Sequence, residues 1–192
     1  MAWIKRTVFA GLALTMCALP VAAQSFNDLW STCLACHGEK GQSETPETPS
    51  LGAQPPAATL IQLYLFREKR RQNEIMAEMA KTMTDADLQK YADAIAKLPA
   101  PKPLADTPDA ARMERGRDLA TKNHCNSCHS PDFSGRDNIP RLAGQREDYL
   151  LKALRDYKSG VRPGYDPQMA EVLATVTDAQ IADAAYYVAR FR

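Results

Sequence analysis

Apolar side chains recur at helical spacing in two separate parts of the chain. Residues three or four positions apart lie on the same face of a helix, so each run predicts an amphipathic helix. The two runs are Leu60, Leu63 and Phe66, and later Leu151, Leu154 and Tyr157. No stretch shows a convincing strand pattern. The apolar positions therefore predict an all-α fold.

A further helix is predicted near the end of each part. Thr84 and Thr177 are each followed by an acidic residue, and a threonine at a helix start can accept hydrogen bonds from free backbone amides. The apolar faces that follow are Leu88, Tyr91, Ile95 and Leu98, and then Ile181, Ala185, Val188 and Phe191. Short helices are also expected around residues 26–30 and 113–121, before two cysteine pairs.

The two parts are copies of one pattern. A C-x-x-C-H motif ends at His37 and again at His129, PSLGAQ at 49–54 matches PRLAGQ at 140–145, and Thr84 matches Thr177, all 91 to 93 residues apart. Between the copies, residues 99–108 contain four prolines, which disfavour helix and predict a stiff extended linker. We expect one domain over residues 24–98 and a second over 109–192.

The N-terminus has the layout of a secretory signal. Lys5 and Arg6 precede an apolar run and small residues that end at Ala23, so residues 1–23 are expected to be cleaved off. The run is too short to span a bilayer, and no later segment approaches the length needed. Cys17 raises the alternative of a lipoprotein, but Met16 before it suits that processing poorly. A periplasmic protein without a transmembrane segment is expected.

The net charge argues against binding to nucleic acid or anionic lipid, and the role of the cysteines has to be explained separately. The formal net charge of the whole chain is +1, which gives no general attraction to nucleic acid or anionic lipid. Four of the five cysteines lie outside the predicted signal, and in an oxidising compartment two disulfides would be the ordinary expectation. Their spacing indicates another use.

Zinc and thiol redox chemistry fit the cysteine pairs less well than covalent haem. A zinc site would have to join pairs with 88 residues between Cys36 and Cys125, against about 15–20 in zinc ribbons. A thioredoxin-like pair expects strands around it. In c-type haem attachment, two thiols add across the porphyrin vinyl groups and the adjacent histidine binds the iron.

The repetition of C-x-x-C-H in matching helical contexts makes haem the prediction. The covalent attachment sites would be Cys33, Cys36, Cys125 and Cys128. His37 and His129 would each supply one axial iron ligand. Each small domain would then fold around a large apolar group, which compensates for the limited core of a short chain.

The duplication also selects the second axial ligand. The first copy has a helical stripe of Met76, Met79 and Met83. The matching residues of the second copy are Met169, Val172 and Val176. A ligand should persist in both copies, whereas valine can replace a methionine that only packs. Met76 and Met169 are therefore predicted to bind the two irons, which raises the reduction potential.

Two further pairs of residues have open interpretations. Pro49 and Pro140 follow the histidines by 12 and 11 residues. Their carbonyls either accept the histidine Nδ1 proton or simply belong to a turn. Arg71 and Arg162 close two basic helix ends and are either solvated or bound to a buried haem propionate.

These motifs together resemble the dihaem cytochromes c4, and more broadly the class I cytochromes c. The likeness rests on both C-x-x-C-H sites, the stretch PRLAGQREDYLLKALRDYKSGVR at 140–162, a methionine eight residues before Thr84 or Thr177, and the terminal helices. It implies two tandem class I cytochrome c domains whose His/Met haems meet near the domain interface. It also implies a periplasmic electron carrier between a dehydrogenase and a terminal oxidase.

The first copy departs from that pattern, and other roles stay open. PSLGAQPPAATLIQLYLFREKRR at 49–71 lacks the Gly-Gln order, the following aromatic residue and the glycine before the arginine. A dihaem subunit bound permanently to a dehydrogenase, such as a flavoprotein sulfide dehydrogenase, is the main alternative, and peripheral membrane association is open. An enzyme of the peroxidase or thiosulfate-oxidising kind would need an iron without methionine, which the paired Met76 and Met169 oppose.

Overall fold

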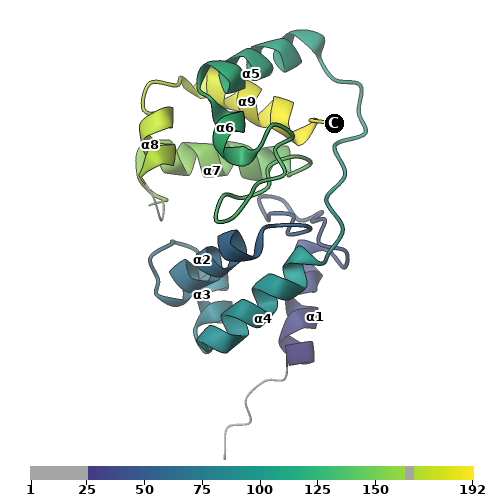
Figure 1. Ribbon diagram of the computed structural model, residues 1–192, viewed down its shortest axis with the longest axis vertical. Coiled ribbons are helices and arrows are strands. Elements are labelled where there is room, and N and C mark those ends of the chain that lie inside the picture. The colour runs from purple at the N-terminus through teal and green to yellow at the C-terminus, as the bar shows by residue number, and fades with distance from the viewer. Residues whose placement is uncertain (1–25, 163–166) are drawn as a thin grey trace, which may run out of the picture.

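The computed structural model describes residues 26–162 and 167–192, and its regular secondary structure within these ranges is α-helix apart from one isolated bridge between Arg136 and Ile139 (Figure 1). The predicted signal and Cys17 lie outside them. The helices of the first half are α1 (Phe26–His37), α2 (Pro56–Arg67), α3 (Glu74–Ala80) and α4 (Asp85–Ala96). Those of the second half are α5 (Ala110–Lys122), α6 (Cys125–His129), α7 (Glu147–Ser159), α8 (Gln168–Leu173) and α9 (Asp178–Ala189). The predicted all-α class is confirmed.

The helices form two bodies that lie one above the other, α1–α4 below and α5–α9 above in Figure 1. We call these the first and second domains. In the first domain α2 packs against α3 and α4, and in the second α9 packs against α5 and α7. The expected limits at residues 98 and 109 remain predictions. None of the described helices is long and apolar enough to cross a bilayer.

The terminal helices begin as the threonines predict. In α4, Thr84 Oγ1 accepts from the Asp87 amide at 3.2 Å, and the Asp87 carboxylate accepts from the Thr84 amide at 2.8 Å. Hydrogen bonds from Thr84 lower the pKa of Asp87. Thr177 and Gln180 form the same reciprocal cap on α9. The predicted apolar faces are buried at Leu88, Tyr91 and Ile95, and at Ile181, Ala185 and Val188.

The helices before the cysteine pairs differ from the expectation. We expected short helices that end before each pair, but α1 continues through both cysteines to His37. In the second domain the helix does break: Asn123 Nδ2 donates to Leu119 O at 3.0 Å and His124 adopts a left-handed φ of 54°. The matching residue of the first domain is Thr32, a β-branched residue that avoids that conformation, so α1 is uninterrupted.

The proline-rich linker is extended and lies against both domains. Lys102 N–H donates to Gln42 Oε1 at 3.2 Å, and Gln42 Nε2 donates back to Lys102 O at 3.3 Å. Further along, the Leu104 amide donates to Ala189 O in the second domain at 3.4 Å. The linker is therefore part of the contact between the domains as well as a spacer.

The linker also explains the altered Gly-Gln order of the first copy. A Cβ atom on Gly52 would lie 2.0 Å from Pro99 O, so the linker requires glycine there. The next residue, Ala53, has a left-handed φ of 51°, at a position where the second domain has Gly144 with a φ of 71°. The first domain thus keeps glycine at the close approach and accepts an alanine in a conformation that favours glycine.

Candidate functional site

The two C-x-x-C-H motifs have the same environment in both domains. Cys33 and Cys125 are partly buried, Cys36 and Cys128 are exposed, and all four thiols are free of disulfides. Burial raises the pKa of Cys33 and of Cys125. The four cysteines are therefore available as two dithiol pairs, each on a helical turn beside a histidine.

Each of these histidines is buried and held by a prolyl carbonyl. His37 Nδ1 lies 2.7 Å from Pro49 O, and His129 Nδ1 lies 2.9 Å from Pro140 O. A carbonyl oxygen only accepts, so Nδ1 carries the proton and Nε2 keeps its lone pair. Burial lowers the pKa of both rings, and the bond to proline opposes this only in part. Both imidazoles are thus neutral and oriented to offer Nε2 to a metal.

The methionines occupy equivalent helices. Met76 lies on α3 and Met169 on α8, and each is partly buried against an apolar cluster of its own domain. Met83 and its counterpart Val176 are both buried, with 6% and 3% of their surface exposed. That pair fills the same place in two cores, as expected of packing residues. The role of Met76 and Met169 as iron ligands stays a prediction.

Arg71 and Arg162 lie together at the contact between the domains. Arg71 donates to Gln62 Oε1 at 2.6 Å and to Tyr149 Oη at 3.1 Å. Arg162 donates to the same two oxygen atoms, at 3.1 Å and 3.3 Å respectively. The two guanidinium groups thus share acceptors within the interface, and their binding of haem propionates stays a prediction.

The two arginines also stack on matching aromatic rings. The Arg71 guanidinium lies 4.5 Å from the centre of the Phe66 ring, and that of Arg162 lies 4.6 Å from the Tyr157 ring. Neither Tyr149 nor Gln62 was predicted. Tyr149 corresponds to Ala58 and Gln62 to Ala153, so comparison of the two copies gives no signal for either residue.

This cluster of four residues has an excess of positive charge. Burial alone raises the pKa of Tyr149, but Arg162 and Arg71 outweigh it and lower that pKa to about 7. Within residues 26–162 and 167–192, neither arginine forms an ion pair with a carboxylate. Two partly buried guanidinium groups that form no ion pair with a carboxylate suit an anionic partner such as a propionate. Together with the free thiols and the available Nε2 atoms, the residues fit a haem in each domain.

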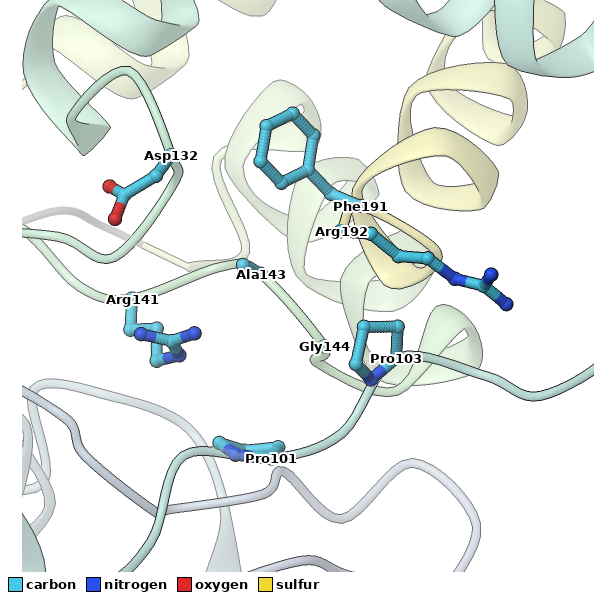
Figure 2. A pocket seen from close by; sticks show the side chains of 8 residues that line it. All are labelled: Pro101, Pro103, Asp132, Arg141, Ala143, Gly144, Phe191 and Arg192. Carbon is cyan, nitrogen blue, oxygen red and sulfur yellow. The ribbon is translucent and has the colours of Figure 1, made fainter.

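A separate cavity of about 310 Å³ lies between the linker and the second domain (Figure 2). Figure 2 shows Pro101 and Pro103 of the linker on one side and Phe191 on the other. Arg141 also lines the cavity, and its Nε is buried without a hydrogen-bond partner among the described residues. No predicted cysteine, histidine or methionine lines this cavity, so it is not the candidate site.

Comparisons with known proteins agree with this reading of the residues. The cytochrome c family model matches residues 113–191. The cytochrome c4 of Thiocapsa roseopersicina is 32% identical over 165 residues, which cover 81% of this chain and 85% of that protein. The thiosulfate dehydrogenase electron acceptor of Thiomonas intermedia is 33% identical, over 83% of this chain and 78% of that protein.

A solved structure extends the likeness to the whole fold. The crystal structure of reduced recombinant cytochrome c4 from Pseudomonas stutzeri superposes with a TM-score of 0.77 at 25% identity, over 89% of this chain and 100% of that chain. The match includes both domains and is consistent with two tandem cytochrome c units. The chain therefore belongs to the cytochrome c4 family, which makes it an electron carrier rather than an enzyme, with one covalently bound haem c in each of its two domains.

Proposed function

We propose that this protein is a periplasmic carrier that takes electrons from a dehydrogenase and passes them to a terminal oxidase or another respiratory partner. The observation that carries the proposal is the repeated arrangement of a buried histidine whose Nδ1 is bound to a prolyl carbonyl, next to two free thiols. Bound haem supplies an iron that alternates between Fe(III) and Fe(II), one electron at a time.

Different residues of the chain would hold the haem of each domain. Cys33 and Cys36 anchor it in the first domain, and Cys125 and Cys128 do so in the second. The neighbouring His37 and His129 bind the metal through Nε2, in an orientation fixed by Pro49 and Pro140.

Met76 and Met169 would also bind the metal, which would leave no position on it for a substrate. The soft thioether favours the reduced state. Arg71 and Arg162 would neutralise the propionates at the domain contact, where neither arginine forms an ion pair with a carboxylate of the described residues. Both potentials are then expected to be high for haem proteins.

The periplasmic location follows from the predicted secretory signal at residues 1–23. N-terminal sequencing of the purified protein should find a mature chain that begins at Gln24. A chain that retains its leader would contradict periplasmic export.

The replacement Met169→Ala tests the ligand assignment most directly. The reduction potential of one of the two haems should fall, and that haem should bind carbon monoxide when reduced. A redox titration followed by optical spectra measures both effects. Met83→Val is the matched control, because the second domain already has valine at that place. An unchanged potential in Met169→Ala, without uptake of carbon monoxide, would rule out methionine ligation there.

A second candidate is a subunit bound permanently to a periplasmic dehydrogenase. The similarity to the thiosulfate dehydrogenase electron acceptor of Thiomonas intermedia supports a dehydrogenase as the partner, in either a transient or a permanent complex. Sedimentation of the native protein at nanomolar concentration separates the two roles: a carrier sediments alone, whereas a permanent subunit stays with its partner.

A further inference from the structure

Two glutamine side chains cross the domain contact in opposite directions. Gln145 of the second domain reaches Ser50 of the first: its Oε1 accepts from the Ser50 amide at 2.7 Å, and its Nε2 donates to Ser50 O at 2.8 Å. Gln54 of the first domain makes the same two bonds, each at 3.0 Å, with the backbone of Arg141 in the second. The exchange is reciprocal, and it joins equivalent positions of the two copies.

These contacts involve the peptide units that hold the buried histidines. The amide of Ser50 belongs to the same peptide as Pro49 O, the acceptor of His37 Nδ1. The chain of bonds therefore runs from His37 Nδ1–H to the Pro49 carbonyl, and from the Ser50 N–H to Gln145 Oε1.

The second domain repeats this chain of hydrogen bonds. His129 Nδ1–H donates to the Pro140 carbonyl, and the Arg141 N–H of that peptide donates to Gln54 Oε1. Each histidine is thus two hydrogen bonds away from a glutamine of the other domain.

We propose that Gln145 and Gln54 are positioning residues that tune the iron potential of the opposite domain through this shared peptide. A peptide whose N–H donates to an acceptor is polarised, so its carbonyl becomes a stronger acceptor in turn. A stronger bond from Nδ1–H makes the imidazole a better electron donor at Nε2, which stabilises Fe(III) and lowers the potential. The proposal rests on the proposed function, because it requires both histidines to ligate iron.

The effect of Gln145 on the first haem and that of Gln54 on the second should differ in size. Ser50 and Gln145 are nearly inaccessible, with 1% and 4% of their surface exposed, whereas Gln54 and Arg141 are only partly buried. Electrostatic polarisation is stronger where water is excluded. Gln145 should therefore have a larger effect on the first haem than Gln54 has on the second.

The test compares Gln145→Leu and Gln54→Leu in the intact dihaem protein by redox titration. Gln145→Leu should raise the reduction potential of the first haem only, and Gln54→Leu should raise that of the second haem only. The two variants should therefore shift different steps of the titration. The larger rise should belong to Gln145→Leu. If Gln145→Leu fails to assemble, Gln54→Leu at the partly exposed contact still decides the question.

A purely structural role gives a different result. Looser docking would expose both haems to water, which lowers both potentials together. A fall in both potentials, or no change in either, would overturn the proposal. Gln42→Leu is the matched control: Gln42 makes the same two bonds, with Lys102, but the peptides it holds serve no histidine. Both potentials should remain as in the wild type.

A second readout follows the hydrogen bond itself. The Ser50 amide should exchange with solvent roughly fivefold faster in Gln145→Leu, and the histidine Nδ1–H proton resonance of the first domain should move upfield. The wild-type spectrum separates this proposal from the proposed function. If the wild type lacks His/Met haems, the proposed function fails, whereas a normal wild type with unshifted variants contradicts only the role of the glutamines.

Discussion

The first and last helices of the two domains are joined by different chemistry, although the folds correspond. In the first domain, α1 and α4 are connected by a stack of Phe26, Trp30 and Tyr91, with the Phe26 and Tyr91 ring centres 4.8 Å apart. In the second domain, α5 and α9 approach so closely at Gly116 that a Cβ there would lie 2.3 Å from Asp183 O.

The second junction also uses ion pairs, and among the described residues none is formed at the equivalent position of α4. Asp183 of α9 accepts from Arg112 at 3.2 Å and from Arg115 at 2.6 Å. Its counterpart on α4 is Lys90, whose amine lies 4.1 Å from the Phe26 ring centre. By contrast, the bond from histidine to proline is the same in both domains. The site restricts the sequence, whereas the helix junction accepts either an aromatic stack or close backbone contact with charged partners.

Removal of the aromatic stack should have the largest effect. Tyr91→Ala deletes a buried ring and should destabilise the first domain by about 3 kcal/mol. Hydrogen exchange of the intact protein should show faster exchange in α1 and α4, with α9 unaffected. Tyr91→Phe keeps the ring and loses only a 3.5 Å bond to Phe26 O, so it should behave almost as the wild type. Equal acceleration in both domains would mean that the junctions are not independent.

The complementary change fills the close approach in the second domain. Gly116→Ala places a methyl group against the α9 backbone and should cost about 2 kcal/mol through overpacking. The amides of α5 and α9 should exchange faster, and those of α4 should not. Glu114→Ala on the exposed side of α5 is the control for helix propensity. If both variants are equally stable, close contact at Gly116 does not hold the junction.

The sequence predicts what is local and repeated. Apolar spacing and the two threonine caps define α2, α4, α7 and α9, and the repeated motif identifies the cysteines and histidines. Contacts across the domain interface could not be predicted. Tyr149 and Gln62 are matched by alanines in the other copy, so the repeat does not mark them.

Gln54 and Gln145 recur at matching positions of the two copies, but the sequence does not show that their bonds cross between the domains, because this depends on how the domains dock. The continuation of α1 through Cys33 and Cys36 was missed for a related reason. It depends on whether a single residue, Thr32 or His124, takes a left-handed conformation.

The charged junction should make the second domain more sensitive to acid, with the smallest of the three effects. Hydrogen bonds from Arg115 and Arg112 lower the pKa of Asp183 in the folded state. Its contribution to stability is therefore complete above the unfolded pKa of about 3.9 and disappears as the pH falls through the lower folded value. Because Arg115 is largely exposed, the contribution is expected to be about 0.5 kcal/mol.

Hydrogen exchange between pH 5 and pH 3, corrected for the intrinsic pH dependence of exchange, measures this contribution. Protection of α9 should fall with pH, and the part due to Asp183 is the difference between the wild type and Asp183→Asn, because Asp87 at the start of α4 and Asp178 at the start of α9 also have lowered pKa values. Asp183→Asn should make the fall in α9 protection less steep, with Asp178 still contributing, and leave α9 slightly less stable at neutral pH. An α9 that keeps the same acid sensitivity in Asp183→Asn would show that other carboxylates control the junction. Arg190, which pairs with Asp106 and Glu147 beside α9, would then be the next position to replace.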